Sequence, residues 1–261
     1  MDKKTKRFLL TNDDGIYARG LTTLYREMSL VGECTIVAPE REQSAVGHAI
    51  TLARPLMVKK ARKGGTFWGY AVEGTPADCV KIGVGELSEV PFDCIVSGIN
   101  RGANVGINVI YSGTVSAATE GTILGIPSIA VSLDSHERDA DYSVAARIAA
   151  HLADAVVTGG LVGGFTLNIN IPALPASEIK GLLLTRQGTA RFEETFEKRV
   201  DPRENIYYWL AGETRVPDGD DTSTDAAAVR AGYISITPLH YDLTRYHDME
   251  MLKQFCDAID F

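Results

Sequence analysis

Three segments of the chain combine acidic, amide and hydroxyl side chains that could bind a metal ion and a phosphate group. The first is residues 11–16 (TNDDGI), which come directly after the apolar residues 8–10. The neighbouring carboxylates of Asp13 and Asp14 repel each other, and both stay ionised only near a cation or hydrogen-bond donors. The same composition is also typical of a polar turn, so this run alone fits a metal site or a turn.

The second segment is residues 97–106 (SGINRGANVG), which also follow an apolar run. Its glycines allow the backbone to approach a ligand closely, although a long irregular loop would have a similar composition. The chain then passes through Ser112, Gly113 and Thr114 into a predicted helix. Free N–H groups and the positive end of the dipole at a helix start bind phosphate. Ser112 or Thr114 could instead only cap that helix.

The third segment is residues 42–48 (EQSAVGH). Ser44 has no evident activating partner in the sequence, and a single loop serine is usually only solvated. His48 could act as a general acid or contact a phosphate, or it could be an ordinary hydrogen-bonded loop histidine. The remaining histidines form no HExxH pattern, and His151 falls within a predicted helix, where a structural role is expected.

Taken together, the three segments offer hard oxygen ligands at Asp13, Asp14, Ser44 and Asn100. This chemistry suits Mg²⁺, Mn²⁺ or Ca²⁺ rather than zinc or copper. The protein is acidic, with 26 Lys plus Arg against 34 Asp plus Glu and a net charge of −8. It should therefore bind neither duplex nucleic acid nor an anionic membrane. A divalent ion beside a helix start would nevertheless allow it to bind a small phosphate compound.

Strand-like and helical patterns alternate along the chain, which favours an α/β fold. The expected strands are apolar on both faces, as in a mostly parallel, Rossmann-like sheet with helices on both faces. Ligands of such sheets bind at the carboxyl ends of the strands, where the three polar segments fall. The expected strands are residues 8–11, 35–38, 93–97, 128–132, 165–171 and 233–237, and the expected helices are 21–28, 77–84, 112–124, 144–156, 226–232 and 249–259.

Residues 186–225 differ in character, since they are rich in charge and contain the aromatic run Ile206-Tyr-Tyr-Trp-Leu210. We expect an extended arm or hairpin that cannot bury its own apolar face. A second subunit is the expected cover for this arm and for the C-terminal segment, which predicts a homodimer or homotetramer. The length of 261 residues fits a single domain over 1–261 that includes the arm.

The four cysteines (Cys34, Cys79, Cys94 and Cys256) are far apart and form no CxxC pair, so they are interpreted as buried thiols in a reducing compartment. No run of about 18 apolar residues is present, and the N-terminal apolar run is too short for a signal-peptide core. These features predict a cytoplasmic protein without a membrane span.

Six ordered blocks of the sequence resemble the SurE family, the stationary-phase survival protein E nucleotidases. The resemblance runs from Leu9 to about Thr244. It implies a Rossmann-like fold with a projecting hairpin and C-terminal exchange between subunits. It also implies a divalent-metal-dependent phosphatase acting on nucleoside 5′- and 3′-monophosphates, with short polyphosphate as a further substrate of some members. The blocks are residues 11–16, 74–79, 97–102, 111–115, 168–172 and 237–239.

By motif position, the resemblance implies that Asp13, Asp14, Ser44 and Asn100 hold one divalent ion per subunit, with Mg²⁺ or Mn²⁺ expected. It implies that Asn12, Ser112, Gly113 and Thr114 contact the phosphate. Many members have Asp where this chain has Asn108, which affects the local charge of the loop. No Cys-(x)5-Arg loop is present, so direct hydrolysis is expected, with Asp13 as the candidate to orient or deprotonate the water.

Other function classes are less compatible with the sequence. An NAD-linked oxidoreductase should show G-x-G-x-x-G after the first strand, where this chain has Asn-Asp-Asp-Gly. A P-loop kinase or ATPase needs a Gly-Lys dipeptide, which does not occur. A non-catalytic nucleotide sensor with the same metal and phosphate site remains the alternative. The sequence does not indicate the preference for base, for 5′ or 3′ phosphate, or for the metal.

Overall fold

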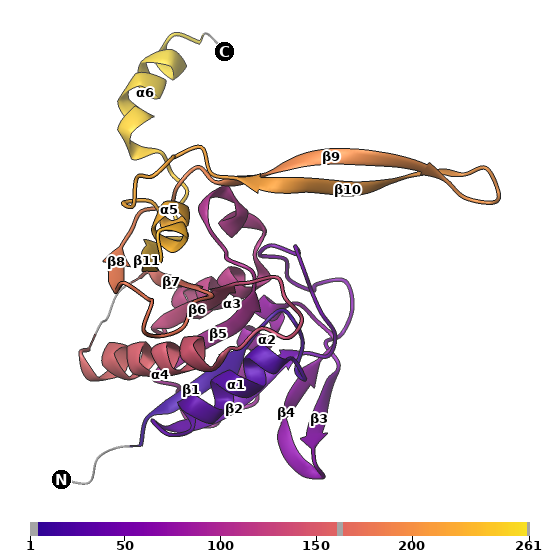
Figure 1. Cartoon of the computed structure of the whole chain (residues 1–261), viewed down its shortest axis with the longest axis vertical. Helices are drawn as coiled ribbons and strands as arrows, with labels where there is room; N and C mark the ends of the chain where they lie inside the picture. Colours follow the sequence, from indigo (N-terminus) through magenta and orange to yellow (C-terminus); the bar gives the residue numbers. More distant parts are fainter. Residues whose placement is uncertain (1–4, 161–163, 260–261) are drawn as a thin grey trace.

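The computed structural model describes residues 5–160 and 164–259, and within them nine strands form one large sheet (Figure 1). The order of strands is β3-β4-β2-β1-β5-β6-β7-β11-β8. Neighbours from β4 to β7 run parallel, while β3 and β11 are antiparallel to their neighbours β4 and β7. The strands are β1 (Arg7–Thr11), β2 (Glu33–Pro39), β3 (Val58–Lys63), β4 (Thr66–Val72), β5 (Cys94–Arg101), β6 (Ser128–Asp134), β7 (Thr166–Pro172), β8 (Leu182–Leu184) and β11 (Ile234–Leu239).

Helices cover both faces of this sheet, as the two sides of β1 demonstrate. Phe8 and Leu10 pack into the core beneath α1 and α4, whereas Leu9 packs into a second core beneath α2 and α3. Adjacent strand residues point to opposite faces, so a strand with two covered faces must be apolar throughout. The predicted fold class is thereby confirmed. The helices are α1 (Arg19–Met28), α2 (Pro76–Gly85), α3 (Gly113–Ile123), α4 (Ser143–Thr158), α5 (Asp225–Arg230) and α6 (Met249–Asp257), with 3₁₀ turns η1 (Gly106–Tyr111) and η2 (Tyr246–Asp248).

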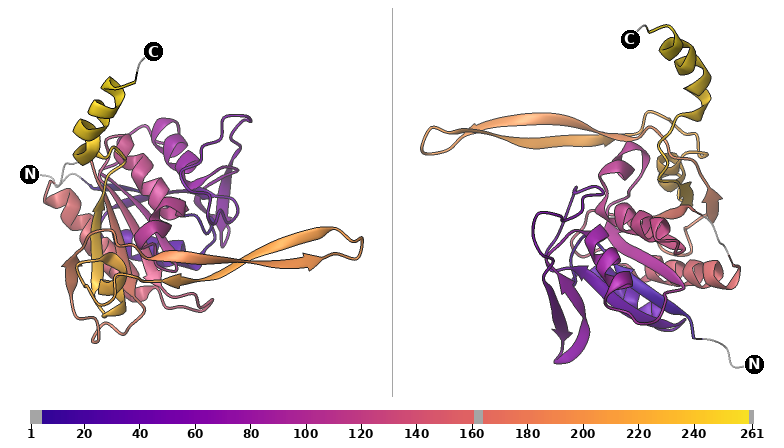
Figure 2. Two further views of the ribbon diagram at one scale, coloured as in Figure 1. Left: turned by 90° about the horizontal axis from the view of Figure 1, so that it is seen from above. Right: turned by 180° about the vertical axis from the view of Figure 1, so that it is seen from behind.

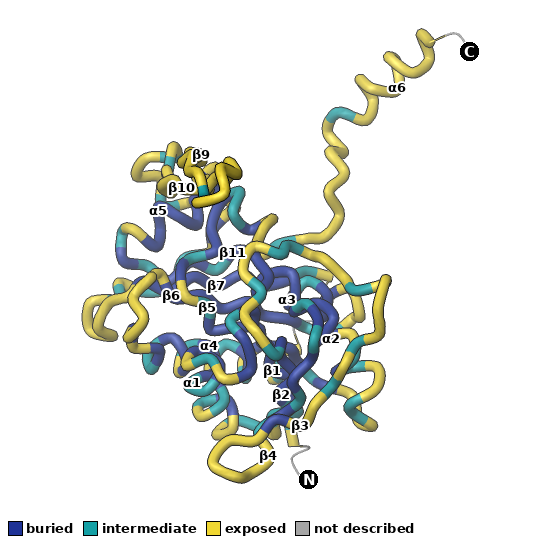
Figure 3. Tube along the Cα trace, turned by 90° about the vertical axis from the view of Figure 1, so that its right-hand side faces the viewer, coloured by how far each residue is buried: buried dark blue, intermediate teal, exposed yellow. Residues whose placement is uncertain are grey.

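A long two-stranded hairpin projects from this body, within the range 186–225 where an arm was expected (Figure 2). It consists of β9 (Arg191–Val200) and β10 (Ile206–Arg215), which pair antiparallel along their whole length. The hairpin and α6 are exposed almost throughout, in contrast to the buried strands of the sheet (Figure 3). The apolar side chains of both segments are therefore largely left exposed by the described part of the chain.

Several local predictions differ from the structure. Helix α4 buries mainly alanines, and its larger apolar residues Ile148 and Leu152 are only partly buried. The small alanine side chains let α4 lie close to α1 and the sheet. Of the four cysteines, Cys79 and Cys94 are buried as predicted, but Cys34 is half-buried and Cys256 is exposed on α6. The prediction of four buried thiols is therefore wrong for Cys256. None of the helices within residues 5–160 and 164–259 has the length and apolarity that crossing a membrane requires.

Candidate functional site

A cavity of about 690 Å³ opens at the carboxyl ends of β2, β1 and β5. These three strands are parallel neighbours with β1 in the middle, so the segments that follow them meet at one edge of the sheet. Five of the residues predicted from the sequence line this cavity: Asp13, Asp14, Ser44, Asn100 and Ser112. The structure thus brings the three polar segments together at one edge of the sheet.

Asp13 is the most constrained of these residues, with only 7% of its surface exposed. Its Oδ1 accepts a hydrogen bond from the Thr114 hydroxyl at 2.5 Å, and its Oδ2 accepts one from the Thr114 backbone N–H at 3.1 Å. Thr114 belongs to the first turn of α3, so the carboxylate sits at the positive end of that helix. Burial raises the pKa of Asp13 above its usual range, and the bonds from Thr114 oppose that rise.

Asp14 lies in a field of negative charge. Burial, followed by the charges of Asp13 and Glu42, raises the pKa of Asp14 to about 6, and Arg101 offsets part of that rise. Glu42 and Arg101 line the same cavity. Two acidic groups whose ionised forms are disfavoured in this way would be stabilised by a bound cation.

Ser44 and Asn100 each have one polar contact that orients an oxygen atom. The Ser44 hydroxyl donates to Glu42 Oε1 at 2.6 Å, which leaves the lone pairs of Oγ for another partner. Asn100 Nδ2 donates to the Gly102 carbonyl at 2.8 Å, which fixes the amide and leaves its Oδ1 as the acceptor. Both side chains line the cavity with the two aspartates.

This donor set fits a hard divalent ion. It offers two carboxylates, one hydroxyl and one amide oxygen, a mixture that Mg²⁺ and Mn²⁺ accept together with water. No group of three or more His, Cys, Asp or Glu that could hold a metal occurs in the described parts of the chain. Asp13, Asp14, Ser44 and Asn100 are the residues that would hold the ion.

The residue that caps the start of α3, Ser112, also lines the cavity. Ser112 is the N-cap residue of α3, and its Oγ accepts a hydrogen bond from the Val115 N–H at 3.1 Å. The capping role that the sequence left open is therefore present. Ser112 also lines the cavity, next to Asp13. Capping and phosphate contact are compatible here, because the hydroxyl can accept from Val115 and donate to a ligand.

We expect Ser112→Ala to affect both stability and catalysis. Loss of the cap should lower the free energy of unfolding by about 0.5–2 kcal/mol. Loss of a phosphate contact should lower kcat/KM on the order of 10²-fold. Chemical denaturation and steady-state kinetics on one preparation separate the two effects. A variant with the lower stability but wild-type kinetics would leave Ser112 with the capping role alone.

The other three residues that were predicted to contact the phosphate are not among those that line the cavity. Thr114 is fully buried and its hydroxyl is bound to Asp13, so it orients that carboxylate. Gly113 lies against Asp13, since a Cβ on it would be 2.8 Å from Asp13 Cβ. Asn12 is fully buried and donates from Nδ2 to the Gly15 carbonyl at 3.0 Å. Its Oδ1 has no hydrogen-bond partner among the residues that the structure describes. The phosphate role of these residues stays a prediction.

The outer wall of the cavity was not foreseen. It includes Tyr111 from η1, Arg191 and Phe192 from the base of the hairpin, and Leu210 from farther along β10, opposite Phe196. Asn108 ties the two elements together, because its Oδ1 accepts a hydrogen bond from the Phe192 N–H at 3.1 Å. His136, from the segment after β6, also belongs to this wall. Nothing in the sequence pattern indicates that the arm, which is expected at a subunit contact, also lines the site.

Comparison with known proteins identifies the family. A family model described as survival protein SurE matches residues 8–194. The chain belongs to the SurE family. It is 61% identical to the 5′-nucleotidase SurE of Syntrophus aciditrophicus, over 95% of this chain and 92% of that protein. It is 52% identical to the 5′-nucleotidase SurE of Syntrophobacter fumaroxidans, over 95% and 99% of the two chains.

A solved structure shows the same fold. The crystal structure of the SurE protein from Aquifex aeolicus matches with a TM-score of 0.83 and 41% sequence identity. The match covers 96% of this chain and all of that chain. The resemblance inferred from the six sequence blocks is thereby confirmed for family and fold.

Proposed function

We propose that the protein is a divalent-metal-dependent phosphatase that hydrolyses nucleoside 5′- and 3′-monophosphates to nucleoside and phosphate, and that also accepts short polyphosphate. The convergence of Asp13, Asp14, Ser44 and Asn100 on one cavity beside the start of α3 carries this proposal. Relatives named 5′-nucleotidase, at up to 61% identity among those compared, support it.

In this proposal, a bound ion supplies positive charge, and residues of the chain position the attacking water and the phosphate. A bound Mg²⁺ or Mn²⁺ would supply charge stabilisation for the phosphate and lower the pKa of a water molecule. Asp13 orients or deprotonates the attacking water, and Thr114 holds the Asp13 carboxylate for that purpose with two hydrogen bonds. Ser112, at the positive end of α3, steadies the phosphate oxygens.

The outer part of the cavity suits the nucleoside. Phe192, Leu210 and Tyr111 give it an apolar and aromatic wall, and Asn108 and Arg191 add polar groups. A volume of about 690 Å³ falls within the range of small-molecule sites, roughly 300–1,000 Å³. A mononucleotide could therefore bind with its phosphate at Asp13 and its base near the hairpin.

Phosphate release from a panel of substrates tests the proposal. We expect release from 5′-AMP, 3′-AMP and tripolyphosphate in the presence of Mn²⁺ or Mg²⁺, and none after treatment with a chelator. A protein that binds AMP and Mn²⁺ without releasing phosphate would instead be a nucleotide sensor, the alternative function. Binding of neither ligand would overturn both functions.

Metal binding should stabilise the protein in a pH-dependent way. The raised pKa of Asp14, about 6, means that a proton on this carboxyl favours the folded metal-free protein. Between pH 7.5 and pH 5 the proton therefore competes with the ion. We expect saturating Mn²⁺ to raise Tm by roughly 5–10 °C at pH 7.5 and by much less at pH 5. An equal rise at both pH values in thermal scans would contradict this site assignment.

The hairpin and α6 are proposed to lie at a contact between identical subunits. Phe196, Trp209 and Leu210 of the hairpin are 66%, 58% and 53% exposed, and Phe255 of α6 is 64% exposed. Apolar surface of this extent is typical of subunit interfaces, and obligate ones commonly bury about 2,000 Å² or more. We expect a homodimer or homotetramer in sedimentation experiments. A stable monomer at micromolar concentration would refute this assembly.

A further inference from the structure

The segment that carries Ser44 into the cavity is long and lacks a core of its own. Residues 40–57 connect β2 to β3 without a helix or a strand, and none of them is buried. Irregular connections of this length are uncommon in compact domains and are usually functional. Apolar packing holds the segment at Leu56, near its far end, which packs against the core beneath α2 and α3. Around Ser44, twelve residues earlier, polar contacts must determine where the side chain lies.

Polar contacts hold this segment on both sides of Ser44. Before Ser44, the Gln43 N–H donates to the Asp13 carbonyl at 2.8 Å. After it, the Gly47 N–H donates to the Tyr111 carbonyl at 3.0 Å. These two bonds join the segment to backbone atoms of the cavity wall.

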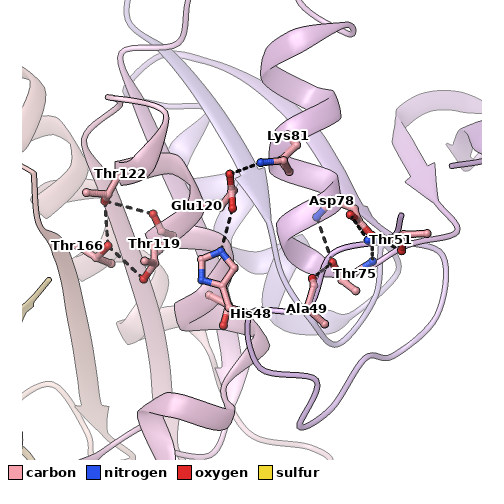
Figure 4. A network of polar contacts seen from close by, with 12 residues as sticks. His48, Ala49, Thr51, Thr75, Asp78, Lys81, Thr119, Glu120, Thr122 and Thr166 are labelled. Atoms are coloured by element: carbon pink, nitrogen blue, oxygen red, sulfur yellow. Dashed lines mark hydrogen bonds and ion pairs between the residues drawn. The ribbon is translucent and has the colours of Figure 1, made fainter. Parts of the chain in front are cut away.

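Farther along, the segment is tied to α2 by a second group of bonds. Asp78 accepts from the backbone N–H and the hydroxyl of Thr51, at 2.9 and 2.6 Å. The Thr75 hydroxyl donates to the Ala49 carbonyl at 2.7 Å (Figure 4). Between Ser44 and these bonds lies His48, the one residue of the segment whose side chain is bonded to α3 in the part of the chain that the structure describes.

The partner of His48 is Glu120, a carboxylate that is almost completely buried. Glu120 Oε2 lies 2.9 Å from His48 Nε2, and Glu120 Oε1 accepts from Lys81 Nζ at 2.7 Å (Figure 4). The Glu120 side chain is 4% exposed, against 34% for His48. The hydrogen bond from His48 lowers the pKa of Glu120, and Lys81 acts in the same direction. Glu120 is therefore a charged, buried anchor with both oxygens in use.

Helix α3 connects this anchor to the catalytic end of the site. Thr114, in its first turn, holds Asp13, and Glu120 follows six residues later, about 9 Å along the helix axis. The helix itself is fixed to the sheet, since the Thr122 hydroxyl lies 2.9 Å from the Thr166 hydroxyl on β7. One rigid element thus holds Asp13 at one point and the Ser44 segment at another.

We propose that His48 and Glu120 are positioning residues that place Ser44 relative to Asp13 and so set the affinity for the divalent ion. Neither residue is among those that line the cavity, so both would act through the segment that they hold. The bond between them transmits the fixed position of α3 to a segment that has no buried residue of its own. This inference rests on the proposed metal-dependent function.

Titration of the substrate-free protein with Mn²⁺, followed by calorimetry, tests the proposal. We expect His48→Ala to weaken Mn²⁺ binding on the order of tenfold, as for other residues that orient metal ligands. Glu120→Gln should weaken it in the same direction, and His48→Gln, which keeps a side-chain N–H donor, should restore part of the affinity. Lys81→Met is the matched control, because it removes the other partner of Glu120 and leaves His48 in place. Its affinity for Mn²⁺ should stay within about twofold of wild type.

A double-mutant cycle separates positioning from a general loss of stability. If His48 acts through Ser44, His48→Ala should not weaken Mn²⁺ binding further in a Ser44→Ala background. Wild-type affinity in His48→Ala, or fully additive losses in the double variant, would overturn the inference. A wild-type protein that binds no Mn²⁺ would instead overturn the proposed metal-dependent function, so the two failures are distinguishable.

Discussion

Replacement of Asp13 by asparagine should lower kcat/KM for AMP on the order of 10³-fold while leaving the fold intact. The carboxylate is both a predicted ion ligand and the candidate to orient the attacking water. Asparagine retains one oxygen, so it can accept only one of the two hydrogen bonds from Thr114. Steady-state phosphate release at saturating Mn²⁺ measures the loss.

The stability of Asp13→Asn distinguishes a site defect from unfolding. Burial raises the pKa of Asp13, so ionisation of this carboxyl is less favourable in the folded metal-free protein than in the unfolded chain. A neutral asparagine removes that unfavourable term, and the metal-free variant should melt within a few degrees of wild type. Asp220→Asn is a matched control, because the Asp220 side chain is fully exposed and lies outside the cavity lining. Wild-type kinetics for Asp13→Asn would remove Asp13 from the catalytic role.

The parts of the fold that the sequence predicts are those with a strong periodic signal. Strand β1 is apolar at Phe8, Leu9 and Leu10, which requires cover on both faces and hence helices above and below. The site prediction followed from this arrangement. Three polar segments after three parallel neighbours must meet at one edge, although their order along the chain says nothing about the distances between them.

Strands β3 and β8, which were missed, lack such a signal. Strand β3 carries Lys59, Lys60, Arg62 and Lys63 at the edge of the sheet, where charge prevents association with other strands and hides the strand pattern. Strand β8 has only three residues. For these two strands, tertiary packing determines the element more than local preference does. Helix α4, in contrast, was predicted, but its contact face consists mainly of alanines, which contribute little to an apolar stripe.

In the site, too, the sequence predicts which residue types are present but not how tertiary packing arranges them. The residue types of Asp13, Asp14, Ser44 and Asn100 indicate their chemistry, because hard oxygen ligands can be recognised in a sequence. The orientation of these side chains cannot be predicted from the sequence. The sequence does not show that Thr114 turns its hydroxyl to Asp13 rather than to the cavity. Nor does it show that Phe192, at the base of an arm, comes to line the site. Such facts depend on contacts between residues far apart in the chain.

Gly113→Ala should be a second variant with a large loss of activity. The structure indicates that this loss would come from a collision with Asp13. In a phosphate-binding turn, a new Cβ would be expected to collide with the phosphate or to require a backbone angle that only glycine tolerates. Gly113 is not among the residues with a left-handed backbone conformation. A Cβ on it would instead lie 2.8 Å from Asp13 Cβ and 3.0 Å from Asp13 Oδ2. Alanine therefore has to displace the carboxylate that the site depends on.

The expected result is a fall in kcat/KM on the order of 10²-fold, since a misplacement of about 1 Å can have that effect. Helix preference works in the opposite direction, because alanine stabilises a helix by about 1 kcal/mol relative to glycine. A large loss of activity with a small change in Tm would thus identify displacement of Asp13 as the cause. Gly85→Ala at the end of α2 is the matched control, because a Cβ there meets nothing within 4 Å. Wild-type kinetics in Gly113→Ala would mean that the position of Asp13 is less critical than its contacts with Thr114 indicate.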